Sequence, residues 1–195
     1  MSAFEPRASP AAGKPDRRRG RPAPRQGISR LSFPADDPAQ WNDLFIATAG
    51  ASAALTGLVF VAVSINIRPI LDEPGLPERA AEPLTFLLGV LTVSILALVP
   101  GQGAVALGTE LAIGSVILAA VIAYLINSGR KRHMRHAWLI GRSVLAVPGT
   151  VPFIIGSVSL LAGGGGGLAW VVAGILGATI GAVYSAWIVL VEILR

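Results

Sequence analysis

The fold is decided by an uncharged stretch from Leu44 to Ile67, which reads LFIATAGASAALTGLVFVAVSINI. An α-helix rises about 1.5 Å per residue, so roughly 20 apolar residues cross the hydrocarbon core of a bilayer, which is about 30 Å thick. Trp41 precedes the stretch, where an indole favours the headgroup region. We therefore expect a transmembrane helix over 44–67, ended by Arg68 and Pro69.

The composition points to the same class of protein. Hydrophobic residues make up 53% of the 195 residues and charged residues 14%, whereas soluble domains carry about 25% charged residues. Eight of the sixteen Lys and Arg lie in the first 30 residues, and five more lie between Arg130 and Arg142. Because these cations flank apolar spans, they are better explained as orientation signals than as a nucleic-acid site. The expected partner is the lipid bilayer, and no nucleic acid.

Two longer apolar blocks must each fold back on themselves. The block 84–127 would measure about 66 Å as one helix, and the block 143–191 about 74 Å, more than twice the core thickness. The turn of the first block is predicted at Pro100-Gly101-Gln102-Gly103, and that of the second at the five glycines 163–167, since Gly and Pro interrupt helices. Pro77 suits a helix start, and Pro83 is expected to kink that helix.

These stretches predict an all-α fold, a polytopic transmembrane helix bundle of about five spans. One transmembrane domain covers 41–195, behind a disordered basic, Pro/Arg-rich tail over 1–40. The fourth span contains Pro148, Gly149 and Pro152, so neighbouring helices would have to cover its irregular backbone. The predicted spans are 44–67, 77–99, 104–127, 143–162 and 168–193.

The orientation follows from the basic residues near the spans. The loop before span four holds five cations, whereas the two glycine turns hold none, so the positive-inside rule makes that loop cytoplasmic. Five spans then place the N-terminus outside and the C-terminus in the cytoplasm. The basic tail competes with this orientation, because a cytoplasmic tail would let its arginines touch anionic lipid. The basic loop consists of Arg130, Lys131, Arg132, Arg135 and Arg142.

Small residues recur at helical spacing in two spans. Such patterns let helix backbones approach closely, so we expect both to be helix contacts within the chain, with a homo-oligomer interface as the alternative. The predicted helix-packing residues are Gly50, Ala54 and Gly57 in the first span, and Gly174, Gly177 and Gly181 in the fifth.

A weakly polar line runs beside the first of these patterns. Thr48, Ser52 and Thr56 recur every four residues, and Glu110 is an ionisable residue less than two turns into the third span. These four residues form a candidate polar path. A position at the membrane interface is the preferred explanation of Glu110, and a buried, proton-binding carboxylate is the alternative.

We find no catalytic constellation in the sequence. There is no cysteine, no HExxH and no GxSxG, and the glycine run lacks the Lys-Ser/Thr of a phosphate loop. His133 and His136 share a loop crowded by cations, which oppose a divalent metal. We therefore expect no enzyme activity, no cofactor and no metal site.

From Trp41 onward three segments carry a family resemblance. They are WNDLFIATAGASAALTGLVFVAVSINI (Trp41–Ile67), LPERAAEPL (Leu76–Leu84) and VPGQ (Val99–Gln102). With these the chain resembles a family of uncharacterised bacterial multi-span integral membrane proteins, some of which are labelled modulator of FtsH protease. The resemblance implies a bacterial inner membrane and a regulatory partner such as a membrane protease complex. It transfers no catalytic or binding residue.

Two functions from different classes fit these features. The first is a non-enzymatic membrane protein that acts through protein partners, in a modulator or assembly role. The second is an oligomeric channel or small-solute transporter, which the polar path and the prolines of span four would favour. Transporters usually carry more polar residues at mid-membrane than this chain does, so the first is preferred.

Overall fold

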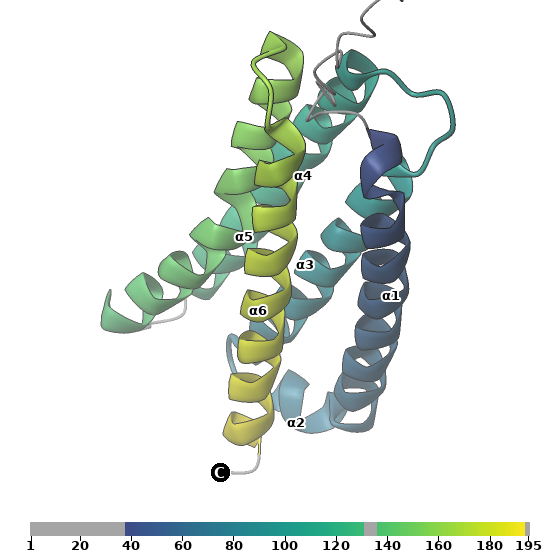
Figure 1. Cartoon of the computed structure of the whole chain (residues 1–195). Coiled ribbons are helices and arrows are strands. Elements are labelled where there is room, and N and C mark those ends of the chain that lie inside the picture. Colours follow the sequence, from purple (N-terminus) through teal and green to yellow (C-terminus); the bar gives the residue numbers. More distant parts are fainter. Residues whose placement is uncertain (1–37, 131–135, 194–195) are drawn as a thin grey trace, which may run out of the picture. The chain divides into compact units, whose positions relative to one another are not determined.

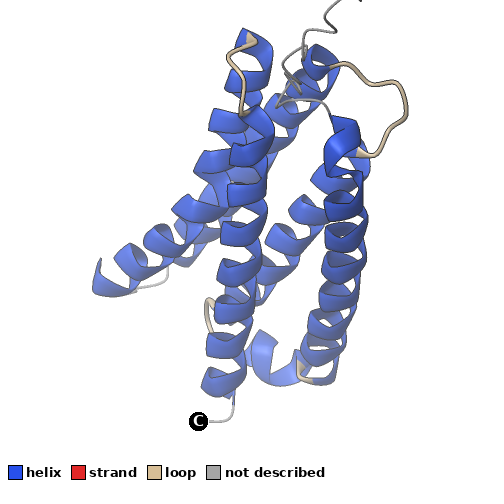
Figure 2. Cartoon of the chain, in the orientation of Figure 1, coloured by secondary structure: helices blue, strands red, loops and turns tan. Residues whose placement is uncertain are grey.

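A computed structural model describes residues 38–130 and 136–193, and every regular element in this part of the chain is a helix (Figures 1 and 2). The predicted all-α fold class is confirmed. Of the predicted tail over 1–40, residues 1–37 lie outside the described residues, whereas residues 38–40 belong to a 3-10 helix. The elements are η1 (Pro38–Trp41), α1 (Asn42–Ile65), α2 (Ile67–Asp72), α3 (Leu76–Ala97), α4 (Ala104–Arg130), α5 (His136–Ala162) and α6 (Gly167–Ile193).

Four of these helices are long and apolar enough to cross a membrane, as expected of a multi-pass membrane protein. They correspond to the first, second, third and fifth predicted spans, and their ends lie within a few residues of the predicted ones. The four apolar segments are Asn42–Ile65, Leu76–Ala97, Ala104–Ser128 and Gly167–Glu192.

The fourth predicted span differs from the others. It falls on α5, which has 27 residues, but the apolar segment found within the described residues of α5 is shorter, Ala146–Ala162. Pro148 and Pro152 lie inside a helix that continues through both of them. Whether α5 crosses the bilayer completely therefore stays a prediction.

The end of the first span is a correction to the sequence analysis. Arg68 and Pro69 do not stop the chain from being helical, because α1 ends at Ile65 and α2 begins at Ile67. Pro69 lies in the first turn of α2, where a backbone N–H has no helical acceptor and its loss costs little. The interruption comes at Asn66, whose N–H still bonds to the Ala62 carbonyl at 3.4 Å.

The two predicted glycine turns are present. Gly101 has a φ of 72°, and three glycines of the five-residue run also have positive φ, a conformation that other residues adopt at a cost. Gly167 is already the first residue of α6, so the second turn is shorter than the glycine run. Pro77 lies in the first turn of α3, as predicted.

Helix α3 lies at the centre of the packing. It contacts α1, α4 and α6, while α5 contacts α4 and α6, so that α3, α4, α5 and α6 form a closed ring of neighbours. The buried core between these helices includes Phe86, Leu111, Phe153 and Val171. Helix α1 is attached outside the ring, mainly through α3: 11% of its apolar segment is buried, against 50% for α3.

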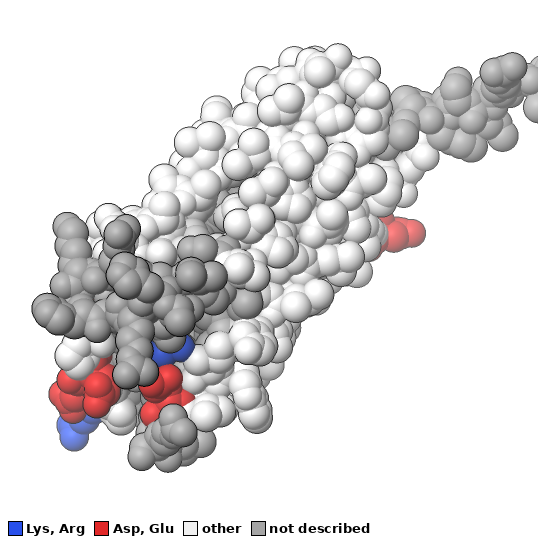
Figure 3. Space-filling model, turned by 90° about the vertical axis from the view of Figure 1, so that its left-hand side faces the viewer, with Lys and Arg blue, Asp and Glu red and all other residues white. Residues whose placement is uncertain are grey.

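Helices α1 and α6 each run in the direction opposite to α3. Thr48 near the start of α1 bonds to Ser94 near the end of α3, and Arg79 near the start of α3 pairs with Glu192 at the end of α6. The first helix therefore begins at the end of the bundle opposite to the one where α6 finishes (Figure 1). The charged side chains seen in Figure 3 gather mostly at one end, and the long wall between the ends is nearly uncharged.

Candidate functional site

One face of α1 is used for contact with α3. Phe45 is fully buried on this face, and Ser52 is buried two turns later. The Thr48 and Ser94 hydroxyl oxygens lie 2.8 Å apart, in a hydrogen bond between α1 and α3. Ser52 donates to the Ala49 carbonyl at 3.1 Å, within its own helix. The face of α1 that contacts α3 is thus mainly apolar. Its hydroxyl groups form their hydrogen bonds within the protein.

The four residues of the predicted polar path do not lie along one continuous line in the structure. Thr56 donates to the Ser52 carbonyl at 2.7 Å, so its hydroxyl also bonds within α1. Glu110 lies on α4, where it accepts a hydrogen bond from Gln102 Nε2 at 2.6 Å. The structure brings Thr48 and Ser52 to the α1–α3 contact and Glu110 to the surface between α3 and α4.

The opposite face of α1 carries the predicted packing glycines. Gly50, Ala54 and Gly57 are exposed, and a methyl group added to either glycine would meet no atom within 4 Å. With 3.6 residues per turn these three positions share one stripe, on the side of α1 turned away from α3. Contacts within the described chain therefore do not explain this stripe, which we call the α1 small-residue face.

The glycines of α6 are placed differently. A Cβ on Gly177 would overlap the carbonyl oxygen of Pro148 in α5, and a Cβ on Gly174 would lie 2.9 Å from the Phe153 ring. Gly181 is buried in the same helix. The α6 part of the predicted packing pattern therefore lies in contacts within the chain.

The prolines of α5 explain why this contact is so close. Pro152 has no N–H, so the Pro148 carbonyl lacks its usual helical donor four residues later. That carbonyl faces Gly177, where the absence of a side chain lets the α6 backbone approach it. Gly149 is enclosed as well, since its Cβ would lie 2.8 Å from the Phe86 ring. The neighbouring helices cover the irregular part of α5, as lipid requires.

A polar cluster joins α3 to α6 at the end where α6 finishes. Arg79 Nη1 donates to Glu192 Oε2 at 3.0 Å, and the Ser185 hydroxyl lies 3.4 Å from Glu82 Oε2. Arg79 and Glu82 are 8% and 7% exposed, whereas the Glu192 side chain is 53% exposed. Charges this deeply enclosed need partners, so the cluster fixes how α3 and α6 meet.

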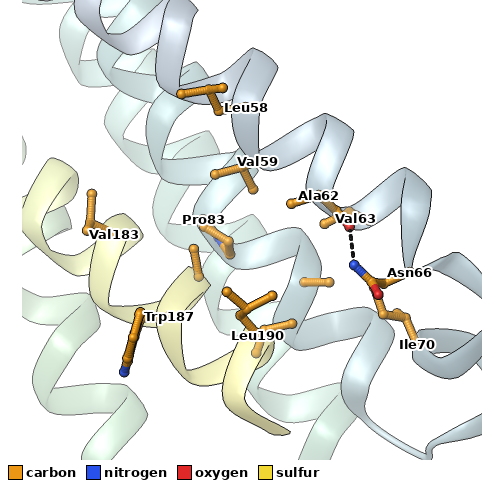
Figure 4. Close-up of a pocket in the computed structure, with 13 residues that line it drawn as sticks. Leu58, Val59, Ala62, Val63, Asn66, Ile70, Pro83, Val183, Trp187 and Leu190 are labelled. Atoms are coloured by element: carbon orange, nitrogen blue, oxygen red, sulfur yellow. Dashed lines mark hydrogen bonds between the residues drawn. The ribbon is translucent and has the colours of Figure 1, made fainter. Parts of the chain in front are cut away.

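Beside this cluster an apolar groove of about 250 Å³ opens between α1 and α6 (Figure 4). Val59 of α1, Pro83 of α3 and Leu190 of α6 contribute to its walls. The Asn66 amide, at one end, donates to the Ala62 carbonyl at 2.8 Å, so the polar group of the wall is already bonded. The groove can hold apolar groups, and its lining offers no nucleophile or acid–base pair.

A second groove of about 250 Å³, which we call the α3–α4 groove, lies between those two helices and ends on Phe153. Glu110 is the ionisable residue in its lining. Within the described residues, no group of three or more His, Cys, Asp or Glu comes together as a metal site would need.

The predicted basic loop lies largely outside the described residues. Residues 131–135 are not described, and although Arg130 ends α4 and Arg142 lies in α5, the structure describes neither side chain.

The sequence analysis missed the Arg79–Glu192 pair and the Glu82–Ser185 contact. A signal was present, since a Glu one turn after an Arg at the start of a helix, followed by Pro83, is unusual in an apolar span. The partners are more than 100 positions away in the sequence, so only the packing of α3 against α6 identifies them.

Comparisons with known proteins add no relative to this picture. No family model, no curated protein and no solved structure matches the chain.

Proposed function

We propose that the chain is a non-enzymatic multi-pass protein of the cell inner (plasma) membrane, and that it acts through other membrane proteins in a modulator or assembly role. The observation that carries the proposal is the α1 small-residue face. Gly50 and Gly57 have open space around them, on a helix that is attached to the rest of the chain through its other face.

The physics of helix association in lipid supports this role. Lipid tails are as apolar as Leu, so membrane helices associate through close packing, and small residues permit the closest approach. Helix α6 uses Gly174 and Gly177 in this way against α5. The α1 small-residue face is suited to receive a helix of a second protein in the same manner. The family resemblance suggests a membrane protease complex as that partner, and a second copy of this chain is the alternative.

The positions of the α1 hydroxyl groups favour this function over a channel or transporter. A hydrated path along α1 would use Thr48, Ser52 and Thr56 to contact water or solute. Instead Thr48 bonds to Ser94, and the other two hydroxyls bond to carbonyls of α1. The hydroxyl groups that would line the path already form hydrogen bonds within the protein.

The proposed orientation has the N-terminus outside and the C-terminus in the cytoplasm. The chain has no cysteine, so one introduced thiol can be labelled alone. Gly103 and Glu73 are exposed at opposite ends of α3. In intact cells a membrane-impermeant maleimide should label Gly103→Cys and leave Glu73→Cys unlabelled. After permeabilisation it should label Glu73→Cys as well. The reverse pattern would overturn the orientation.

Affinity purification tests the partner role. The tagged full chain is purified in mild detergent, and the mass of the complex and its components are measured by mass spectrometry. We expect one partner at fixed stoichiometry, lost in the Gly50→Leu/Gly57→Leu variant. Ala173→Leu, at an exposed alanine of α6, is the matched control and should keep the partner. A monomer with no partner in native membranes and in detergent alike would contradict the proposal.

A further inference from the structure

The α3–α4 groove differs from the groove of Figure 4 in having an ionisable group at one end. Glu110 lies on α4 near the Pro100–Gly103 turn, and the remaining lining extends along α4 to Val121 and along α3 from Leu96 to Thr85. The residues between are mainly apolar. The full lining is Thr85, Leu88, Gly89, Thr92, Val93, Leu96, Glu110, Leu111, Gly114, Ser115, Ile117, Leu118, Val121 and Phe153.

The length of this groove matches one leaflet of a bilayer. Eleven helical steps from Glu110 to Val121 span about 16 Å, roughly half of a hydrocarbon core of about 30 Å. Leu88 and Ile117 are 49% and 58% exposed, so the groove is open along its side to the surrounding lipid. Its shape suits an acyl chain that enters sideways, with the polar end of the molecule near Glu110.

The hydroxyl groups in the lining do not make the groove polar. Thr85 and Thr92 donate to carbonyls of α3 at 2.8 Å, and Ser115 donates to the Ala112 carbonyl at 2.9 Å. Since these donors are already bonded within their own helices, the walls present mainly carbon to an occupant. Glu110 is therefore the group that selects the head of the occupant.

The acceptors near Glu110 favour a head group that donates hydrogen bonds. Glu110 Oε2 accepts from Gln102 Nε2, and Gln102 Oε1 is buried with no hydrogen-bond partner among the described residues. A carboxylate has about four acceptor sites, so one bond leaves capacity for more. A primary ammonium brings three N–H donors and a positive charge to the Glu110 carboxylate, which lines the groove.

The charges at this end of the bundle point the same way. No Lys or Arg occurs between Arg79 and Arg130, nor between residues 143 and 193, so the described helix ends near Glu110 supply no cation for a phosphate. The basic residues before α1 lie outside the described residues. Asp43, exposed at the start of α1, adds a second negative charge at this end. At short range the Glu110 carboxylate attracts a cationic head group.

We propose that the α3–α4 groove is a binding site for a phospholipid with a primary ammonium head group, of the phosphatidylethanolamine class. One acyl chain lies along the groove in a single leaflet, and the ammonium group pairs with Glu110. This site lies on α3 and α4, apart from the α1 small-residue face, so it stands or falls independently of the protein partner.

Gly114 supplies a sharp test of the acyl-chain position. It lines the groove at the middle of α4, and an added Cβ would meet no atom within 4 Å. Leucine at this position fills the groove without pushing on a neighbouring helix, and it favours the helix more than glycine does. Ala120→Leu is the matched control, because Ala120 is exposed on the same helix and lies outside the groove lining.

The experiment is a lipid titration of the purified full chain, read by native mass spectrometry. Phosphatidylethanolamine and phosphatidylglycerol with identical acyl chains are compared on the wild type and three variants. A charge-assisted hydrogen bond corresponds to about a tenfold preference for the ethanolamine lipid. Glu110→Gln should abolish that preference, Gly114→Leu should weaken binding about tenfold, and Ala120→Leu should bind as the wild type does.

Two results would overturn the proposal. One is equal binding of the two lipids by the wild type, and the other is an ethanolamine preference that survives in Glu110→Gln. Circular dichroism of each variant shows whether it remains helical. Should Gly114→Leu fail to fold, the near-isosteric Glu110→Gln comparison still decides the outcome.

Discussion

Helices α6 and α1 carry similar patterns of small residues and use them differently. In α6 the glycines meet Pro148 and Phe153 of α5, so that backbone and ring pack where side chains would not fit. In α1, Gly50 and Gly57 have nothing within 4 Å. Small-residue spacing therefore identifies a helix surface that can pack closely. It does not identify the helix that packs against this surface, which only the tertiary contacts show.

The contrast extends to how each helix is held. Helix α6 has neighbours on two sides, α5 and α3, and its end is paired to Arg79. Helix α1 is held mainly by α3, through buried Phe45 and the bond between Thr48 and Ser94. The stability of the two contacts should differ accordingly, and substitutions at matched positions can measure the difference.

The largest effect is expected from Gly177→Ala. The added methyl would overlap the Pro148 carbonyl, which is backbone and cannot rotate away, so we expect a loss of about 3 kcal/mol in unfolding free energy. Gly50→Ala is the matched control and should cause no loss, because its methyl enters open space and alanine favours the helix more than glycine does. Unfolding of both variants in mixed micelles is the measurement. Equal losses of unfolding free energy in the two variants would contradict the difference in packing between α6 and α1.

A smaller effect is expected from Glu192→Gln at the end of α6. The substitution removes the charge that faces the enclosed Arg79. Because the Glu192 side chain is half exposed, we expect the free energy of unfolding to fall by about 1 kcal/mol, which is less than for a fully buried pair. Asp43→Asn, at the exposed start of α1, should change stability by less than about 0.5 kcal/mol. A larger effect at Asp43 than at Glu192 would mean that α1 is the more firmly anchored helix.

The smallest effect should come from the hydroxyl pair that joins α1 to α3. Hydrogen bonds between membrane helices contribute on average about 0.6 kcal/mol in double-mutant cycles. A cycle of Thr48→Val and Ser94→Ala should therefore give a coupling near that value. No measurable coupling would show that apolar contacts, those of Phe45, Leu55 and Val59 among them, attach α1 to α3 without a contribution from this bond.

The positions of the helices could be predicted because glycine and proline act locally. Gly101 and the glycine run mark turns through backbone freedom, and Pro77 marks a helix start through its missing N–H. The prediction that Arg68 and Pro69 end the helix was wrong for a related reason. A proline that follows a helix and a proline in the first turn of the next helix look alike in sequence.

The contacts between helices could not be predicted in the same way. Arg79 and Glu192 are separated by 113 positions, and their pairing depends on how α3 and α6 rotate toward each other. Similarly, the sequence does not distinguish Gly177, which packs against the Pro148 backbone, from Gly57, which has no neighbouring atom within 4 Å of an added Cβ. Both distinctions arise from tertiary packing, whereas periodicity describes one helix at a time.

Photo-crosslinking from the α1 small-residue face in native membranes shows most directly whether a partner helix covers this face. A single cysteine at Ala54, labelled with a photoreactive probe, should give one defined protein adduct of a partner, and that adduct should disappear when Gly50 and Gly57 are changed to leucine. Ala173→Cys on α6 should yield lipid adducts. An adduct pattern at Ala54 that equals the pattern at Ala173 would show that lipid covers this face and would contradict the proposed function. A dimer of the chain itself would identify a second copy as the occupant and favour the oligomeric alternative.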